Sequence, residues 1–200
     1  AREKAAREKE AREKKAQGPW EQLFATLSSM TIEPYGVMGW QMGEADRIGK
    51  APNNSIVFVD PAGLPYIESG QTAGAGSASG AIYKEMKLKA FPEDVREKVI
   101  EEGEAVYHKY DTKDRPTYNV IHAVGPNFEE DYADWAPATH MTQAIEKLAI
   151  AYSNVFVEFA GCPLAEEVQN PDHDLYLRLL PISGGVFAGA FRDVIGNLTM

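Results

Sequence analysis

A chain of 200 residues has room for one compact domain and an appendage, and its 44% hydrophobic and 25% charged residues are typical of a globular protein. The net charge of −10 argues against general nucleic-acid binding, which needs clustered Lys and Arg, and no apolar run reaches the ~18 residues of a membrane helix. The single Cys162 excludes an internal disulfide, and no secretory signal opens the chain.

The cysteine count also bears on compartment and metal binding. Proteins of oxidising compartments commonly pair their cysteines, so we expect an intracellular, reducing location, most simply the cytoplasm, with an organelle left open. The four histidines show no metal-ligand spacing. We therefore expect neither a metal nor a cofactor.

The first 18 residues differ from everything after them. Residues 1–17 repeat Ala, Arg, Glu and Lys, which all favour helix, and Gly18 ends the repeat. They hold seven Lys or Arg against four Glu, whereas the remaining 183 residues hold 13 against 26. We interpret 1–18 as a charged helical extension and 19–200 as the folded domain. The extension is either a solvated spacer or, through 1–17, a docking arm for an acidic protein partner or RNA.

Helical and strand patterns alternate through the first half of the domain. Trp20, Leu23, Phe24 and Leu27 recur at helical spacing and are expected to cover one side of the domain, within a mixed segment over 20–50. A β-branched and aromatic run at 55–59 predicts a buried strand. A turn at 60–63 follows it, and helices are predicted over about 81–90 and 92–107.

The second half continues the alternation. Strands are predicted over 118–124, 154–159 and 175–180, with a helix over about 137–152 between the first two. Strands separated by helical patterns predict an α/β layered sheet. In such sheets, ligands bind beyond the carboxyl ends of the strands.

Two loops rich in glycine, at 70–80 and 183–185, fall at such ends, and each is expected to lead into a helix. Small residues let the backbone turn its N–H groups toward an anion, and a following helix adds free N–H groups and a positive dipole end. Neither loop has the lysine of a P-loop ATPase, and the first begins too far beyond its strand for a dinucleotide-binding turn. A phosphate-binding edge is therefore predicted, with plain packing loops as the alternative.

An ordered series of motifs resembles the macrodomain family. Ile56-Val-Phe-Val-Asp-Pro-Ala-Gly63 is similar to the family's strand and Asn-Ala-Ala-Asn turn, and 74–82 to its first glycine loop with the following helix. Val120-Ile-His-Ala-Val-Gly-Pro126 is typical of a family strand, and 179–187 resembles the second loop. The resemblance covers about 55–195. It implies a three-layer α/β/α fold with a mixed sheet, and a cleft for ADP-ribose or an ADP-ribosylated protein.

The resemblance also implies which residues meet the ligand. The second loop would hold the diphosphate, the first would close from the other side, and Phe187 would pack on the distal ribose. The implied ligand residues are Ala62, Gly63, Gly74, Gly76, Ser77, Gly80, Ile82, Ser183, Gly184, Gly185, Val186 and Phe187.

One departure from the family concerns catalysis. The second asparagine of the turn, which holds the distal ribose in hydrolytic members, corresponds to Gly63. Asp60 is the one candidate for a catalytic base, and His122 is interpreted as a core residue with its polar atoms satisfied. Three functions stay open: a binding module without hydrolase activity, a degenerate macrodomain that serves as a structural component, and a weak ADP-ribosyl hydrolase.

Overall fold

The computed structural model describes residues 30–41, 46–111, 116–164 and 174–198. The chain divides between Pro34 and Tyr35 into two units, and the fold described below is that of the second. The predicted extension at 1–18 and the apolar segment at 20–27 lie outside the described residues.

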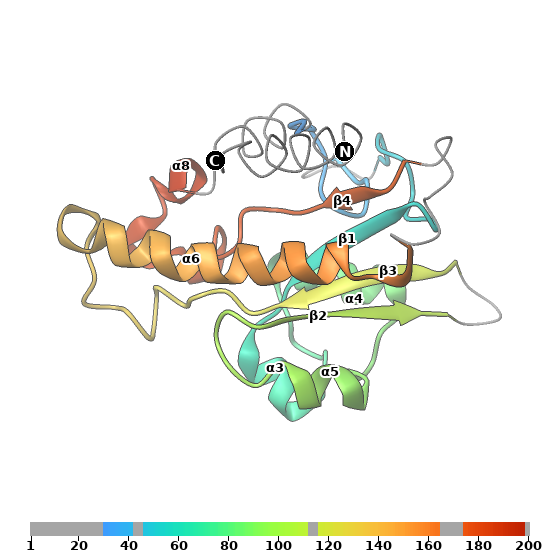
Figure 1. The fold of residues 1–200 in the computed structure, drawn as a ribbon, viewed down its shortest axis with the longest axis horizontal. Helices are drawn as coiled ribbons and strands as arrows, with labels where there is room; N and C mark the ends of the chain where they lie inside the picture. The colour runs from blue at the N-terminus through green and yellow to red at the C-terminus, as the bar shows by residue number, and fades with distance from the viewer. Residues whose placement is uncertain (1–29, 42–45, 112–115, 165–173, 199–200) are drawn as a thin grey trace, which may run out of the picture. The chain divides into compact units, whose positions relative to one another are not determined.

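A mixed four-stranded sheet forms the centre of this unit (Figure 1). Its strands are β1 (Ile56–Pro61), β2 (Ala105–Tyr110), β3 (Tyr118–Ala123) and β4 (Tyr176–Arg178), in the order β2-β3-β1-β4. β1 pairs in parallel with β3 and β4, and β2 runs antiparallel to β3 at the edge. The chain is therefore an α/β protein, as predicted.

The two central strands are the ones predicted with the clearest patterns. Every residue of β3 is buried, and so is every residue of β1 except Pro61. Strands covered on both faces need apolar side chains pointing both ways, which explains the apolar run at 56–59 and the mostly apolar run at 118–124. Both strand predictions are confirmed, and the strand predicted over 175–180 is confirmed as the shorter β4.

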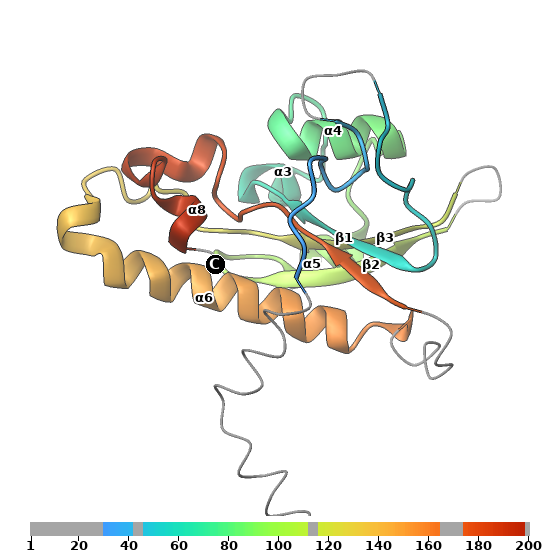
Figure 2. The same cartoon turned by 90° about the horizontal axis from the view of Figure 1, so that it is seen from above.

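Helices pack on both faces of the sheet (Figure 2). On one face lie α3 (Leu64–Ser69), α4 (Ser77–Met86) and α5 (Glu93–Lys98). The other face is covered by the long α6 (Pro137–Ala160), with α8 (Ile195–Leu198) contributing to the same core. None of the helices in the described ranges combines the length and the apolarity that crossing a bilayer requires.

Alternating side chains of the strands divide the core into two clusters. Phe58 and Val120 pack with α4 and α5, whereas Val57 and Ile121 pack with α6. The segment before β1 also reaches the first cluster through Val37 and Met38, and Arg178 of β4 donates to the Val37 carbonyl (3.3 Å). The four apolar residues on which the expected cover of one side of the domain rested lie outside the described residues, so that expectation stays a prediction.

The strand predicted over 154–159 is wrong, because these residues complete α6. Their β-branched and aromatic side chains favour a strand locally. However, Ala144, Leu148, Ala151 and Val155 are buried at steps of three and four, so the inward stripe of the helix continues through the segment. Packing against the sheet overrides the local preference.

The helix predicted over 92–107 is wrong in its second half. α5 ends at Lys98, and Gly103 has a φ of 90°, which ends any helical path. The chain then forms β2, whose residues pair with β3 in register from Ala105 opposite Ala123. The helix predicted over 81–90 is confirmed as α4, although it ends at Met86.

The helix predicted from about residue 186 is a 3-10 helix, η1 (Val186–Phe191). A kink interrupts it at Gly189, where φ is 49° and ψ is −135°. A Cβ built on Gly189 would overlap the carbonyl of Phe128, so the close approach of these two segments requires glycine. An α-helix cannot continue through such a kink.

Candidate ligand-binding site

The C-terminal ends of β4, β1 and β3 lie at one edge of the sheet because the three strands are parallel. The segments that leave this edge are 62–63 after β1, 124–126 after β3 and 179–185 after β4. On α4, the hydroxyl of Ser79 donates to the carbonyl of Pro61 (3.2 Å), which brings the first glycine loop to the same edge. Both glycine loops therefore lie at the end of the sheet where the three parallel strands finish.

The loop after β4 packs tightly on the segment after β3. A Cβ built on Gly125 would overlap Cγ2 of Ile182 and lie 2.6 Å from Oγ of Ser183. The Ser183 hydroxyl donates to the Pro126 carbonyl (2.6 Å), and Ser183 has a φ of 59°. With its side chain used in this way, Ser183 fixes the conformation of the loop.

Phe187 links the loop after β4 to the end of β1. A Cβ built on Gly63 would lie 3.2 Å from Cζ of Phe187 and 3.3 Å from Cδ2 of Tyr66. The Phe187 carbonyl accepts the N–H of Phe128 (2.9 Å), from the segment after β3. Segments that are distant in sequence thus meet around one half-buried aromatic ring.

Tyr66 continues this series of contacts to the first glycine loop. Its hydroxyl donates to the carbonyl of Gly74 (3.0 Å), whose φ of 87° favours glycine. A Cβ built on Gly80 would overlap the carbonyl of Ala75, so the loop folds back closely on the first turn of α4. The two glycine loops are therefore connected through Phe187, Gly63 and Tyr66.

The backbone is open at the start of α4 and of η1. Cβ atoms built on Gly76 and Gly185 would meet nothing within 4 Å, and both residues are exposed. Among the described residues, no side chain caps the N-terminus of either helix. The first N–H groups of α4 have no partner within the helix and lie at its positive dipole end, so they are available to an anion.

The predicted ligand residues separate into two groups. Those at least partly exposed are Gly74, Gly76, Ser77, Gly80, Gly184, Gly185, Val186 and Phe187. Those buried are Ala62, Gly63, Ile82 and Ser183. Ala62 and Ile82 belong to the hydrophobic core, so their side chains pack inside the domain beneath the proposed site.

A row of buried polar side chains begins at the same end of β1. Asp60 is 0% exposed, and its Oδ2 accepts the hydroxyl of Tyr83 on α4 (2.7 Å). The same oxygen lies 2.8 Å from Nδ1 of His122, which stands opposite Asp60 in the β1–β3 register. Nε2 of His122 lies 2.8 Å from the hydroxyl of Tyr110 on β2. Both ring nitrogens of His122 are hydrogen-bonded, which confirms its interpretation as a satisfied core residue.

The two tyrosines of this row, Tyr83 and Tyr110, both have raised pKa values. Burial, and then the charge of Asp60, raise the pKa of Tyr83 far above its ordinary value. Burial, followed by the charges of Asp60 and Asp94, raises that of Tyr110 as well. Both phenols therefore stay neutral, and Tyr83 donates to the carboxylate.

The surroundings of Asp60 do not suit a catalytic base. A base must reach the water or substrate from which it removes a proton. The Asp60 side chain is fully buried, and its Oδ1 has no hydrogen-bond partner among the described residues. Sequence reasoning singled out Asp60 and His122 separately but missed their pairing. The available indication was that each is a polar residue within an apolar run near the end of its strand.

The donor groups at the edge suit an anion better than a metal ion. Among the residues that the structure describes, no three His, Cys, Asp or Glu side chains group as a metal site requires. Exposed backbone at Gly76 and Gly185 lies there instead. Comparison with known proteins assigns no family, since neither a scan against models of protein families nor a search of curated proteins gives a match to this chain.

Proposed function

We propose that this edge binds ADP-ribose or a related nucleotide diphosphate, either free or attached to a protein. The observation that carries the proposal is that both glycine loops, with open backbone at Gly76 and Gly185, lie where three parallel strands end. A diphosphate is negatively charged and accepts many hydrogen bonds, so it suits a site built from N–H donors. No lysine or arginine is needed for such a site, which is consistent with the acidic composition.

The arrangement of the helices supports the macrodomain-like, three-layer fold in this proposal. α4 and α5 contact one face of the sheet and α6 the other, and the sheet is mixed through its antiparallel edge strand β2. In this setting, Phe187 would lie under the ribose next to the diphosphate. Its contact with Gly63 places it at the end of β1, beside the residues that join the two loops.

We propose binding without hydrolysis. Gly63 has no side chain to hold a ribose or a water, and Phe187 lies against its backbone. The Asp60 carboxylate is buried and bonded to Tyr83 and His122. Neither residue offers a group that could activate a water at the ligand.

A second candidate function is that of a structural component in a larger assembly. The observation that favours it is the outer face of α6, where Ile150 and Val157 are 56% and 67% exposed. Large apolar side chains in such positions commonly mark a surface for another protein. This function would leave the edge of the sheet empty, so a ligand titration separates the two.

Isothermal titration calorimetry with ADP-ribose tests the first proposal, and the variant Gly185→Glu tests the site. A carboxylate at this open position would take the space of the diphosphate and repel it, so we expect binding to be lost while the fold is kept. Gly196→Glu is the matched control, because it adds the same side chain at another open glycine, on α8. No heat of binding for the parent would favour the structural function. Equal affinity in parent and Gly185→Glu would remove the second loop from the site.

A further inference from the structure

The start of α4 has an uncommon backbone conformation. Its first residue, Ser77, has a φ of 51°, in the left-handed region that residues with a side chain seldom adopt. The second glycine loop contains a matching case, since Ser183 has a φ of 59°. Such conformations cost free energy and persist only where the surrounding structure enforces them. Each loop therefore needs contacts that hold its serine in place.

Ser183 is held by its own side chain, whereas the start of α4 lacks such a contact. The Ser183 hydroxyl donates to the Pro126 carbonyl (2.6 Å). Among the described residues, no side chain caps the N-terminus of α4. On the loop side, the Tyr66 hydroxyl donates to the carbonyl of Gly74 (3.0 Å), three residues before Ser77. The other side of Ser77 must be held through the body of α4.

Two side chains of α4 attach the helix to the end of β1. Ser79 and Tyr83 are four residues apart, so they lie on the same face of α4. The Ser79 hydroxyl donates to the carbonyl of Pro61 (3.2 Å), and the Tyr83 hydroxyl donates to Oδ2 of Asp60 (2.7 Å). Asp60 and Pro61 are the last two residues of β1. Both hydrogen bonds therefore end at the edge of the sheet that carries the proposed site.

The attachment through Tyr83 is the buried one. Asp60 is 0% exposed and Tyr83 is 4% exposed, so water does not compete for their hydrogen bond. A hydrogen bond to a carboxylate is also stronger than one between neutral groups. Oδ2 of Asp60 lies 2.8 Å from Nδ1 of His122 on β3, which fixes the carboxylate in turn. The start of α4 is thus connected to both central strands through one carboxylate.

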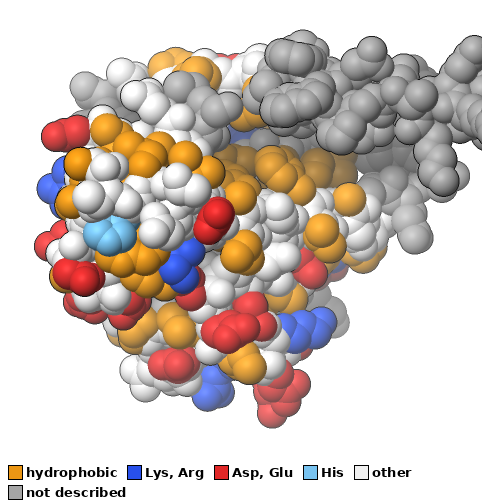
Figure 3. Space-filling model, turned by 60° about the vertical axis from the view of Figure 1, so that its left-hand side comes forward, with side chains coloured by type: hydrophobic (Ala, Val, Ile, Leu, Met, Phe, Trp, Pro, Cys, Tyr) orange, Lys and Arg blue, Asp and Glu red, His pale blue; other side chains and the backbone are white. Residues whose placement is uncertain are grey.

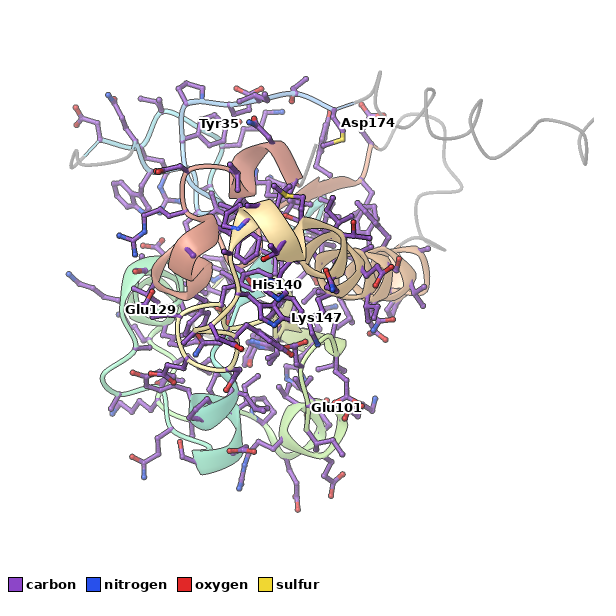
Figure 4. All side chains as sticks on the ribbon, turned by 90° about the vertical axis from the view of Figure 1, so that its left-hand side faces the viewer. Tyr35, Glu101, Glu129, His140, Lys147 and Asp174 are labelled. Atoms are coloured by element: carbon purple, nitrogen blue, oxygen red, sulfur yellow. The ribbon has the colours of Figure 1, made fainter. Side chains whose placement is uncertain are left out.

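The charges at this end of the molecule make the position of the backbone donors important. β1, β3 and β4 run toward the left in Figure 1, so Figures 3 and 4 view the molecule from the side where these strands end. Figure 3 shows charged side chains of both signs scattered over this side between hydrophobic ones, and Figure 4 labels one of the carboxylates, Glu129. An anion held by backbone N–H groups depends on their direction, because hydrogen bonds weaken steeply when they are misaligned.

We infer that Tyr83 is a positioning residue of the proposed site: its bond to Asp60 fixes the start of α4 at the edge of the sheet. The inference rests on the proposed function, in which the first N–H groups of α4 face the diphosphate. Tyr83 itself is buried and touches no ligand. It acts by holding α4, and with it Ser77, in the conformation that directs these N–H groups outward.

Hydrogen exchange of the full chain without ligand tests whether Tyr83 holds α4. Tyr83→Phe removes the hydroxyl and keeps the ring, which packs edge-on to Phe91. The amides from Gly80 onward make the first backbone hydrogen bonds of α4, and we expect them to exchange at least about fivefold faster in the variant. Val155→Ala is the matched control, because it weakens the core on the other face of the sheet and should leave exchange in α4 unchanged.

Calorimetry with ADP-ribose, well below the melting temperatures of both variants, tests the consequence for the site. We expect Kd to rise by about tenfold in Tyr83→Phe, because the donors lose their fixed direction. Val155→Ala should bind like the parent although its core is also weakened. A residue that served only stability would not separate the two variants in this way.

The two measurements distinguish failure of the inference from failure of the proposed function. Unchanged exchange in α4 of Tyr83→Phe would overturn the inference, and so would an unchanged Kd despite faster exchange. A parent that binds no ADP-ribose would overturn the proposed function and the role of Tyr83 in the site with it. In that case, faster exchange in Tyr83→Phe would still show that Tyr83 holds α4.

Discussion

Two histidine–aspartate pairs lie on the side of the sheet that α4 and α5 cover, and each joins Nδ1 to Oδ2 over 2.8 Å. The side chains of His122 and Asp60 are both 0% exposed, whereas those of His108 and Asp94 are 23% and 48% exposed. Because the distances agree, any difference in energy comes from the surroundings. Water screens the exposed pair, while breaking the buried pair leaves a polar or charged group without solvent.

The two pairs belong to one continuous set of side chains. The Tyr110 hydroxyl is hydrogen-bonded to Nε2 of His122, and the Tyr110 ring lies edge-on to that of His108, with centroids 4.5 Å apart. Phe91, which is itself buried, lies edge-on to His122, with centroids 5.3 Å apart. The two pairs therefore lie in one layer of the protein but in different environments, one buried and one open to solvent.

The largest expected effect follows from breaking the buried pair. His122→Ala should lower the free energy of unfolding by about 3–5 kcal/mol, because Asp60 and Tyr110 both lose a partner in the core. Urea unfolding at neutral pH measures it. His108→Ala is the matched control, with an expected loss of at most about 1 kcal/mol. Equal losses in the two variants would show that burial does not separate the pairs.

A double replacement distinguishes the loss of the pair from the loss of volume. Asp60→Leu together with His122→Leu removes both polar groups and keeps the space filled. Replacing both partners of a buried hydrogen bond by apolar groups of similar size can be nearly neutral, and no buried carboxyl group then lacks its histidine partner, so the double variant should be more stable than His122→Ala. A double variant as unstable as His122→Ala would assign the cost to packing instead.

The stability that Tyr83 and Tyr110 contribute should also depend on pH in the alkaline range. The raised pKa values of Tyr83 and Tyr110 mean that the folded protein holds two protons that the unfolded chain releases above about pH 10. Stability from this source is full below that pH and falls above it by about 1.4 kcal/mol per pH unit for each tyrosine. Unfolding in urea at about pH 9 and about pH 11 measures the slope. The variant Tyr83→Phe with Tyr110→Phe should lose it, and an unchanged slope would contradict the assignment.

Features that depend on neighbouring residues in the sequence could be predicted, whereas features that depend on contacts between distant segments could not. The central strands and both glycine loops could be predicted because each depends on a contiguous run of residues. The pairing of Asp60 with His122 could not, since it depends on how β1 and β3 align. The contact of Phe187 with Gly63 could not be predicted either, because Phe187 lies in a segment more than a hundred residues later in the chain.

The two errors in secondary structure have a related cause. Residues 154–159 read as a strand because Phe156 and Val157 are apolar, although they face outward on α6. A periodicity argument assumes that apolar residues face the core, so an apolar outer surface defeats it. Residues 105–107, the start of β2, are predicted as the end of a helix because an edge strand is only half-buried, and its pattern is correspondingly weak.

The smallest expected effect concerns the exposed pair and its pH dependence. Desolvation alone would raise the pKa of Asp94, but the hydrogen bond and charge of His108 outweigh it and hold that pKa below its ordinary value. A carboxyl with a lowered pKa in the folded state stabilises the protein above the unfolded value of about 3.9, and this contribution is lost as the pH falls through the folded value. Asp94→Asn should therefore cost less than about 1 kcal/mol at pH 7, since water screens a pair of this exposure. The difference between parent and variant should shrink as the pH falls through the lowered folded-state pKa of Asp94, because the parent's carboxyl then also takes up a proton. Urea unfolding at a series of pH values measures both, and a difference that persists in acid would mean that Asp94 stabilises α5 by something other than its charge.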